Sequence, residues 1–326
     1  MKRTSQLMSV VEASQLIEQG ASLVIAGSAE SLERLPAGNW IGGTTPYFMT
    51  EAGGLCDQQQ VFVQALGLPV ARIASYDREQ LPHVLEDAPE HGLTLLILPA
   101  ASQVLEDYAQ QAPDYADMFI KPVAGWVAGM HLDQVGQARA MVYNGQEGRS
   151  YADQAVALHC PLPENLLAHI EIVNLFQPGS GPVLRFGETG FSATDCLVDG
   201  QPANLASLIR ERQIDTRVPL VADYCGALIN VSVQAVDEHK VQFYAPVFAG
   251  IDYRFSEPLE DYPSQFIEAL PAQEGEMLLG CNCILNYLYS QLEGRCTGDL
   301  TGPITFGEVA YQLLNQTAVR ISLIEN

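Results

Sequence analysis

The sequence predicts an α+β fold: two sheet-rich lobes of mixed and antiparallel strands, with helices interspersed among them. Stretches with strand character outnumber stretches with helical periodicity, and the hairpin-type turns Asn144-Gly145 and Asp199-Gly200 lie among them. The regular alternation of strand and helix that builds a parallel βαβ sheet is missing. A length of 326 residues suits two domains, which we place at residues 1–200 and 201–326.

The first half of the chain opens with an amphipathic helix at residues 9–19, which Gly20 ends. A second helix is expected at 79–86 and a third at 102–110, where Ser102 is suited to cap the first turn. Apolar or alternating runs predict the strands 22–26, 60–66, 72–76, 93–98, 122–128, 139–143 and 155–159.

The second half also contains more strands than helices. Strands are expected at 170–176, 183–186, 196–198, 218–222, 227–236, 241–244, 276–279, 305–314 and 319–324. Helices are expected at 203–212, 264–270 and 284–293, and Gly294 suits the left-handed position after the last one. Before the first of these helices we expect a positive φ at Gly200, with Pro202-Ala203 opening the helix.

The composition indicates a globular protein with ample material for buried cores. Hydrophobic residues make up 48% of the chain and charged residues 17%, which excludes a disordered or fibrous protein. The 16 Lys and Arg face 39 Asp and Glu, so the formal net charge is −23. Such a charge repels phosphate backbones and anionic membrane surfaces. We therefore expect neither a nucleic-acid partner nor a membrane partner.

The sequence favours a cytoplasmic location. Glu12 and Glu18 interrupt any apolar core of a signal peptide, and the longest apolar run, 93–98, is far too short to span a bilayer. The odd number and wide spacing of the seven cysteines indicate free thiols in a reducing compartment. These cysteines are Cys56, Cys160, Cys196, Cys225, Cys281, Cys283 and Cys296.

Common signatures of cofactor and metal sites are missing from the sequence. It contains no Walker motif, no GxGxxG after a strand, no GxSxG and no HExxH, and its six histidines are scattered. We therefore expect no cofactor and no metal. Gly42-Gly43, before Thr44, is interpreted either as a tight turn where backbones approach closely or as a ligand-facing loop whose amides and hydroxyls bind an anion or carboxylate.

The most distinctive cluster is Cys281-Asn282-Cys283, with Cys296 thirteen residues beyond Cys283. A zinc site would lack a fourth ligand at ordinary spacing. A second interpretation uses the helix that follows, because a helix N-terminus lowers a thiol pKa and makes a nucleophile or redox sensor. In the third interpretation, the thiols are simply small buried hydrophobic groups.

Other side chains are also candidates for a site. Glu308 lies in an apolar stretch, where an acid is costly unless a partner compensates it, and Arg295 and Arg320 are candidate partners. Trp40 and Trp126, the only tryptophans, lie beside glycines and suit either the core or a pocket wall.

Four segments together resemble the FIST family of sensory domains, named for F-box and intracellular signal transduction proteins. They are residues 40–44 (WIGGT), 199–203 (DGQPA), 280–283 (GCNC) and 302–309 (GPITFGEV). The resemblance implies a sensory module for amino acids or related metabolites that signals through a protein partner. It implies no catalytic residues, because the family is not regarded as enzymatic.

We therefore expect a small-molecule sensor whose ligand lies between the lobes. Cys283 and Glu308 should lie close together and form one wall of the ligand site. The helix N-terminal amides from Cys283 onward suit a ligand carboxylate, and the Glu308 carboxyl group suits a ligand ammonium group. The expected ligand-binding residues are Trp40, Gly43, Thr44, Trp126, Cys281, Asn282, Cys283, Arg295 and Glu308. One alternative is a hydrolase or transferase that uses Cys281 or Cys283 as its nucleophile, and another is an interaction scaffold.

Overall fold

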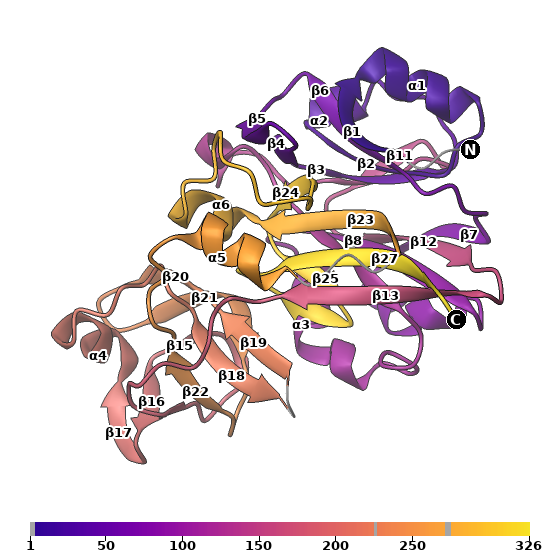
Figure 1. Ribbon diagram of the computed structural model, residues 1–326. Helices are drawn as coiled ribbons and strands as arrows, with labels where there is room; N and C mark the ends of the chain where they lie inside the picture. The colour runs from indigo at the N-terminus through magenta and orange to yellow at the C-terminus, as the bar shows by residue number, and fades with distance from the viewer. Residues whose placement is uncertain (1–3, 225–226, 271–274) are drawn as a thin grey trace.

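The chain forms an α+β protein with two sheet-rich lobes (Figure 1). The computed structural model describes residues 4–224, 227–270 and 275–326. We call residues 4–173 and 262–326 the main body and residues 184–255 the small lobe. The small lobe is an insertion, because the chain leaves the main body after residue 173 and returns to it at residue 262, where the last strands of the main body follow.

The first sheet of the main body carries the N-terminal strands in the order β1-β6-β2-β3-β10-β11. Helix α1, expected from the sequence, packs on its outer face, and a capping box between Ser9 and Glu12 closes its first turn. The elements are β1 (Thr4–Ser9), α1 (Val10–Glu18), β2 (Leu23–Gly27), α2 (Ala29–Leu32), β3 (Trp40–Thr44), β6 (Gln60–Ala65), β10 (Val142–Asn144) and β11 (Arg149–Tyr151).

The second sheet has the order β26-β25-β9-β8-β12-β7, with β8 and β9 parallel. Helix α3 covers its outer face and is capped by Ser102, as expected. The elements are β7 (Arg72–Tyr76), η1 (Leu81–Glu86), β8 (Gly92–Pro99), α3 (Gln103–Gln111), η2 (Ala112–Asp114), β9 (Val123–Ala128), η3 (Leu132–Gln134), β12 (Ala155–Pro161), β25 (Glu308–Ala310) and β26 (Gln312–Leu314).

The third sheet has the order β13-β27-β23-β24-β4-β5, with β23 and β24 parallel. Two short helices, α5 and α6, pack against it. The elements are β4 (Tyr47–Thr50), β5 (Gly53–Cys56), β13 (Leu166–Val173), α5 (Tyr262–Ala269), β23 (Glu276–Cys283), α6 (Ile284–Tyr289), β24 (Gly302–Thr305) and β27 (Ala318–Glu325).

The small lobe consists of a six-stranded sheet, a three-stranded sheet and helix α4 around their own apolar core. The sheet orders are β17-β16-β14-β22-β18-β19 and β15-β21-β20. The elements are β14 (Leu184–Arg185), β15 (Gly190–Ala193), β16 (Asp195–Val198), β17 (Gln201–Asn204), α4 (Leu205–Glu211), β18 (Leu220–Tyr224), β19 (Ala227–Val231), β20 (Val233–Val236), β21 (Val241–Val247) and β22 (Asp252–Phe255).

Strand pairing crosses the expected boundary between residues 200 and 201. Hairpin β16–β17 spans it, and the Asp199-Gly200 turn has φ values of 49° and 82°, which confirms the expected positive φ at Gly200. Strands β23 to β27 then complete the second and third sheets of the main body. The sheets therefore divide the chain into a discontinuous main body and an inserted small lobe.

Some expected element limits are wrong. Pro202-Ala203 belong to β17 instead of opening a helix, because Asn204 caps α4 by accepting a hydrogen bond from the Ser207 amide. The single strand expected at 305–314 is divided among β24, β25 and β26, with a left-handed residue, Tyr311, between the last two. Helix α6 ends at Tyr289, earlier than expected.

The cysteines that the structure describes are free, and four of them are buried. Cys225 lies outside the described residues. None of the described helices is both long enough and apolar enough to cross a membrane.

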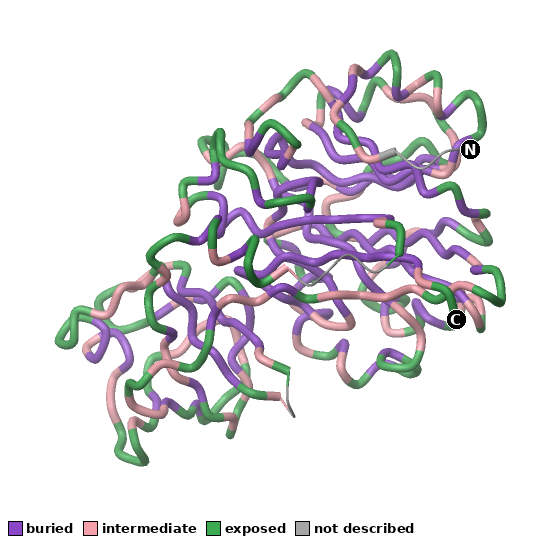
Figure 2. Tube along the Cα trace, in the orientation of Figure 1, coloured by how far each residue is buried: buried purple, intermediate pink, exposed green. Residues whose placement is uncertain are grey.

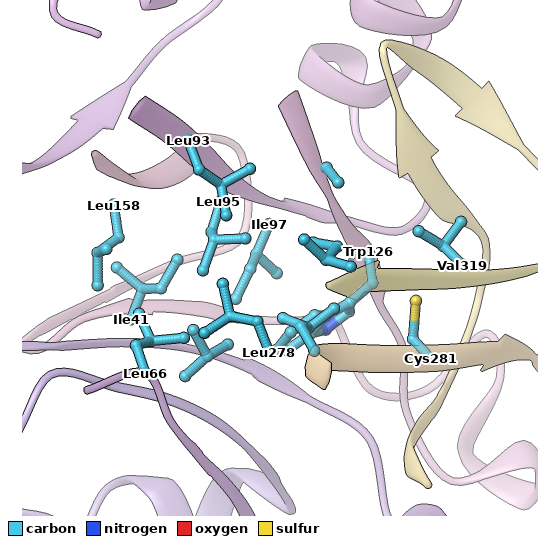
Figure 3. Packing of buried hydrophobic residues seen from close by; sticks show 14 of the residues in the cluster. Ile41, Leu66, Leu93, Leu95, Ile97, Trp126, Leu158, Leu278, Cys281 and Val319 are labelled. Atoms are coloured by element: carbon cyan, nitrogen blue, oxygen red, sulfur yellow. The ribbon is translucent and has the colours of Figure 1, made fainter. Parts of the chain in front are cut away.

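The three sheets of the main body share one apolar core (Figure 3). Buried residues fill the region between the sheets, whereas exposed residues concentrate in the connecting loops (Figure 2). Gly42-Gly43 lie within β3, so the expected turn or ligand-facing loop is wrong. A Cβ atom on Gly43 would lie 2.8 Å from Ile97 Cγ2 and 3.0 Å from Trp126 Nε1. Glycine is therefore needed here because β3 passes very close to the second sheet.

We predict that Gly43→Ala destabilises the protein by about 1–3 kcal/mol, because the added methyl group overpacks the contact between two sheets. Denaturant unfolding measures the change. Gly187→Ala is the matched control, since a Cβ there would meet nothing within 4 Å. Equal stability of the two variants would contradict the close-packing role of Gly43.

Candidate functional site

A cavity of about 500 Å³ lies between the main body and the small lobe. The main body contributes side chains from α3, α6 and the loops after β8, β9 and β24, and the small lobe contributes side chains from β15, β20 and β21. Apolar side chains that line it include Leu105, Leu285, Leu288, Phe306, Phe191 and Phe243. The volume is within the range of pockets that bind small organic ligands.

The cavity lies at the carboxyl ends of two parallel strand pairs, β8–β9 and β23–β24. Strands β8 and β9 end at Pro99 and Ala128, and β23 and β24 end at Cys283 and Thr305. The next residues along each strand, such as Ala100, Ile284 and Phe306, line the cavity. In open α/β sheets, ligands bind outside the carboxyl ends of parallel strands. The topology therefore places the cavity where ligand sites recur.

Ala101, in the loop between β8 and α3, adds a second sign of a functional loop. It lines the cavity and has φ of 54°, in the left-handed region that non-glycine residues seldom occupy. Strained backbone of this kind is concentrated at ligand-binding and catalytic loops. Ser102 is engaged elsewhere, because its hydroxyl donates to Pro99 O at 2.6 Å and accepts from the Leu105 amide.

Charged groups of opposite sign reach the cavity from the two lobes. Glu106 comes from α3 of the main body and Lys240 from the start of the small-lobe strand β21. One Glu106 oxygen accepts a hydrogen bond from Gln103 Nε2 at 2.7 Å. Among the described residues, Lys240 forms no ion pair, in a chain where acids outnumber cations 39 to 16. The cavity thus has an apolar interior and one group of each charge.

Glu308 and Cys283 lie together, as the sequence predicted, but inside the core. Glu308 is fully buried, and its Oε1 and Oε2 lie 3.0 Å from Thr305 Oγ1 and 2.7 Å from Thr317 Oγ1. The Cys283 side chain also forms a hydrogen bond with this carboxyl group. The cavity wall begins at their neighbours Ile284 and Phe306. The pair therefore lies one layer behind the cavity.

The two arginines considered as partners of Glu308 are paired elsewhere. Arg295 Nη2 lies 2.9 Å from Asp261 Oδ1 at the surface, and Arg320 Nε lies 2.5 Å from Glu171 Oε2. Two threonine hydroxyls, instead of an arginine, compensate the acid. Burial raises the pKa of Glu308 to about 8, so the carboxyl group is largely protonated at neutral pH.

The thiols of Cys281 and Cys283 are buried to about 1% exposure. Burial, followed by the nearby Glu308 carboxylate, raises the pKa of each thiol well above its ordinary value. The N-terminus of α6 was expected to lower the thiol pKa, but burial raises the pKa by more. A thiolate nucleophile needs the reverse, a lowered pKa and access for substrate.

The other expected site residues are spread over the main body. Trp40 Nε1 donates to Pro36 O at 2.9 Å, and Thr44 Oγ1 donates to Gly129 O at 2.6 Å. Trp126 is buried in the shared core, and Asn282 Oδ1 accepts from Asn286 Nδ2 at 2.9 Å. None of these residues lines the cavity, and their role in ligand binding stays a prediction.

The described residues contain no group of three or more His, Cys, Asp or Glu side chains that could hold a metal ion. His159 is a buried core residue, with ring nitrogens 3.0 Å from Tyr76 Oη and 2.9 Å from Thr94 Oγ1. Burial lowers its pKa to about 4, so the ring is neutral.

A signal for the cavity residues was present in the sequence but was not used. Ala100, Ala101 and Ser102 follow the buried strand β8, and Gly129-Met130 follow β9. Small residues and a helix cap after an apolar strand are typical of ligand-facing loops in α/β folds. Lys240 and Gln242 carried no such signal, because Lys240 directly precedes an ordinary strand of the small lobe, β21, and Gln242 lies within it.

Comparison with known proteins gives one match. A family model described as "Family of unknown function (DUF6976)" matches residues 8–324. No curated protein and no solved structure matches the chain.

We predict that iodoacetamide labels Cys56 and Cys296 in the native protein but not Cys281 or Cys283, because only the first two are exposed. Mass spectrometry of labelled peptides measures the reaction, and denatured protein is the control in which all four react. Fast native labelling of Cys281 or Cys283 would contradict their burial and support a reactive thiol.

We predict that Glu308 makes stability fall as pH rises. Its folded pKa, about 8, lies above the ordinary value of 4.5, so the folded state retains a proton that the unfolded chain releases. The stability it contributes is complete below pH 4.5 and is lost as pH rises to 8, by about 3–5 kcal/mol. Glu308→Gln should remove this slope in denaturant unfolding, whereas Glu211→Gln, at an exposed acid, should keep it.

Proposed function

The chain belongs to the family DUF6976, whose function is unknown, and we propose that it binds a small molecule in the cavity between its two lobes. The observation that carries this proposal is the construction of the cavity. Both lobes supply its walls, at the carboxyl ends of two parallel strand pairs. A ligand held there contacts both lobes and thereby couples their positions.

The lining supports a ligand with an apolar body and a polar end. Leu285, Phe306 and Phe243 favour an aliphatic or aromatic group. Glu106 and Lys240 approach from opposite lobes and suit an ammonium group and a carboxylate, respectively. Amino acids with apolar side chains combine these features, so we keep them as the first ligand class to test.

We further propose that binding serves sensing in the cytoplasm. The free cysteines are compatible with a reducing compartment. A ligand that prefers one arrangement of the lobes shifts the population towards it. A protein partner that contacts both lobes would detect this shift, which is the signalling role expected from the resemblance to sensory domains.

A cysteine-dependent hydrolase or transferase has less support. Cys281 and Cys283 are buried, their pKa values are raised, and they lie behind the cavity wall. The thiols therefore lack both access to substrate and the ionised state that attack requires.

The direct test is a thermal-shift screen of amino acids, organic acids, amines and nucleotides. A specific ligand at a hundredfold excess over its dissociation constant adds about 2.7 kcal/mol of stability by mass action. We expect stabilisation by apolar amino acids and none by nucleotides, whose phosphates meet a single cation. Failure of every class to stabilise the protein would oppose the binding function and favour the scaffold alternative.

We predict that Leu288→Arg weakens binding of a ligand from this screen at least about tenfold, because it places a charged chain in an apolar wall. Isothermal titration calorimetry measures the affinity. Ile267→Arg is the matched control, since Ile267 is similarly exposed (49% against 39%) but lies outside the cavity lining. Equal loss of affinity in both variants would contradict binding in the cavity.

A further inference from the structure

A buried polar seam joins the small lobe to the main body. Asn230 and Ser232, from the β19–β20 region, meet Asn315 and Gln316, from the turn between β26 and β27. Asn315 Nδ2 donates to Asn230 O at 3.0 Å, and the Ser232 hydroxyl lies 2.5 Å from the side-chain oxygens of Asn315 and Gln316. All four residues are at most 2% exposed. The hydrogen bonds of the seam contribute to holding the lobes together, beside the apolar contacts of the small-lobe residues Ile229 and Ala245 with the main body.

Glu308 is attached directly to this seam. Thr317, the residue after Gln316, places its hydroxyl 2.7 Å from Glu308 Oε2. On the other side, Phe306, two residues before Glu308, lines the cavity. The carboxyl group thus lies between the seam that positions the small lobe and the wall of the cavity.

Burial of Glu308 favours the neutral acid more strongly than its hydrogen-bond donors, Thr317, Thr305 and Cys283, favour the anion. Thr305 Oγ1 lies within reach of both Glu308 Oε1, at 3.0 Å, and Asn282 O, at 3.3 Å. A protonated Glu308 can donate to Thr305, which then donates to Asn282 O, so every proton has an acceptor. When Glu308 ionises, Thr305 must turn to the carboxylate, and Asn282 O loses this hydrogen bond.

No charged side chain of the described residues compensates the anion. The ionisable groups that face Glu308 are Cys281 and Cys283 of β23 and Tyr262 of α5, and the pKa of each is raised well above its ordinary value, mainly by burial. The strands paired with β25 place Trp126 and Leu314 opposite Glu308, and neither ionises. Neighbouring β24 and β27 contribute the hydroxyls of Thr305 and Thr317.

We propose that the protonation state of the Glu308 carboxyl group controls the seam, and we call this group the latch. When it is protonated, it keeps the small lobe closed over the cavity. When it is ionised, it loosens the seam and weakens ligand binding. Opening of the seam beside Thr317 would let water reach the buried anion and so relieve the cost of its burial. The expected pKa of about 8 puts the transition within reach of ordinary buffers. The effect on the cavity rests on the proposed function, whereas the effect on the seam does not.

The first test measures the seam without any ligand. Amide hydrogen exchange of peptides covering residues 228–232 and 314–317 is compared between wild type and Glu308→Gln at the same pH, so that intrinsic exchange rates cancel. We expect the ratio of wild-type exchange to Glu308→Gln exchange to rise at least about fivefold from about pH 6.5 to about pH 9. An unchanged ratio would overturn the latch.

The second test measures the cavity with 8-anilinonaphthalene-1-sulfonate, a fluorescent apolar probe. We expect its dissociation constant in the wild type to rise at least about fivefold from pH 6.5 to 9, and in Glu308→Gln to stay constant. Glu211→Gln, at an exposed acid of the small lobe, should behave as the wild type. A wild-type seam that opens without a change in probe affinity would overturn control of the cavity.

Two variants separate the possible failures. Thr317→Val keeps the acid but removes its hydrogen bond to the seam. The pH dependence of global stability should therefore remain. The difference in seam exchange from Glu308→Gln should become smaller than it is for the wild type. An unchanged exchange difference in this variant would overturn the role of Thr317 and with it the latch. Leu288→Arg should weaken probe binding at every pH. If it does not, the probe binds elsewhere, and ligand binding in the cavity is contradicted. The hydrogen-exchange test of the latch does not depend on this result.

Discussion

The architecture depends on pairing between strands that lie far apart in the sequence. Strand β25 pairs with β9, placing Glu308 opposite Trp126, and β27 pairs with both β13 and β23. These pairs close the main body around the point where the small lobe leaves it. They also bring the carboxyl ends of β8, β9, β23 and β24 to the same side, and the cavity exists because those ends converge.

Local features of the fold are predictable because neighbouring residues determine them. Helix α3 begins at the expected serine cap, Ser102, and the Asp199-Gly200 turn has the expected backbone conformation. The need for glycine at position 43 was not predictable, since it arises from Ile97 and Trp126 on another sheet. The division into lobes was missed for the same reason, because no local pattern states that β23 to β27 return to the main body.

The chemically distinctive residues Cys283 and Glu308 lie in the layer behind the cavity and not in its wall. An acid in an apolar stretch does need compensation, but two threonine hydroxyls supply it for Glu308, and hydroxyls of this kind carry no signal in a sequence. The residues that face the cavity, such as Leu285 and Phe306, look like ordinary core residues. Glu106 and Lys240 come together only because the lobes meet, so sequence alone could not pair them.

The inserted position of the small lobe has a consequence for biosynthesis. A ribosome produces β9 and β13 well before β23, β25 and β27, because the whole small lobe is made in between. During that interval the nascent main body exposes unpaired strand edges, which invite wrong pairing and aggregation. The small lobe has its own core and can fold early, whereas the main body must wait. Chaperones that shield strand edges would therefore act mainly on the unfinished main body.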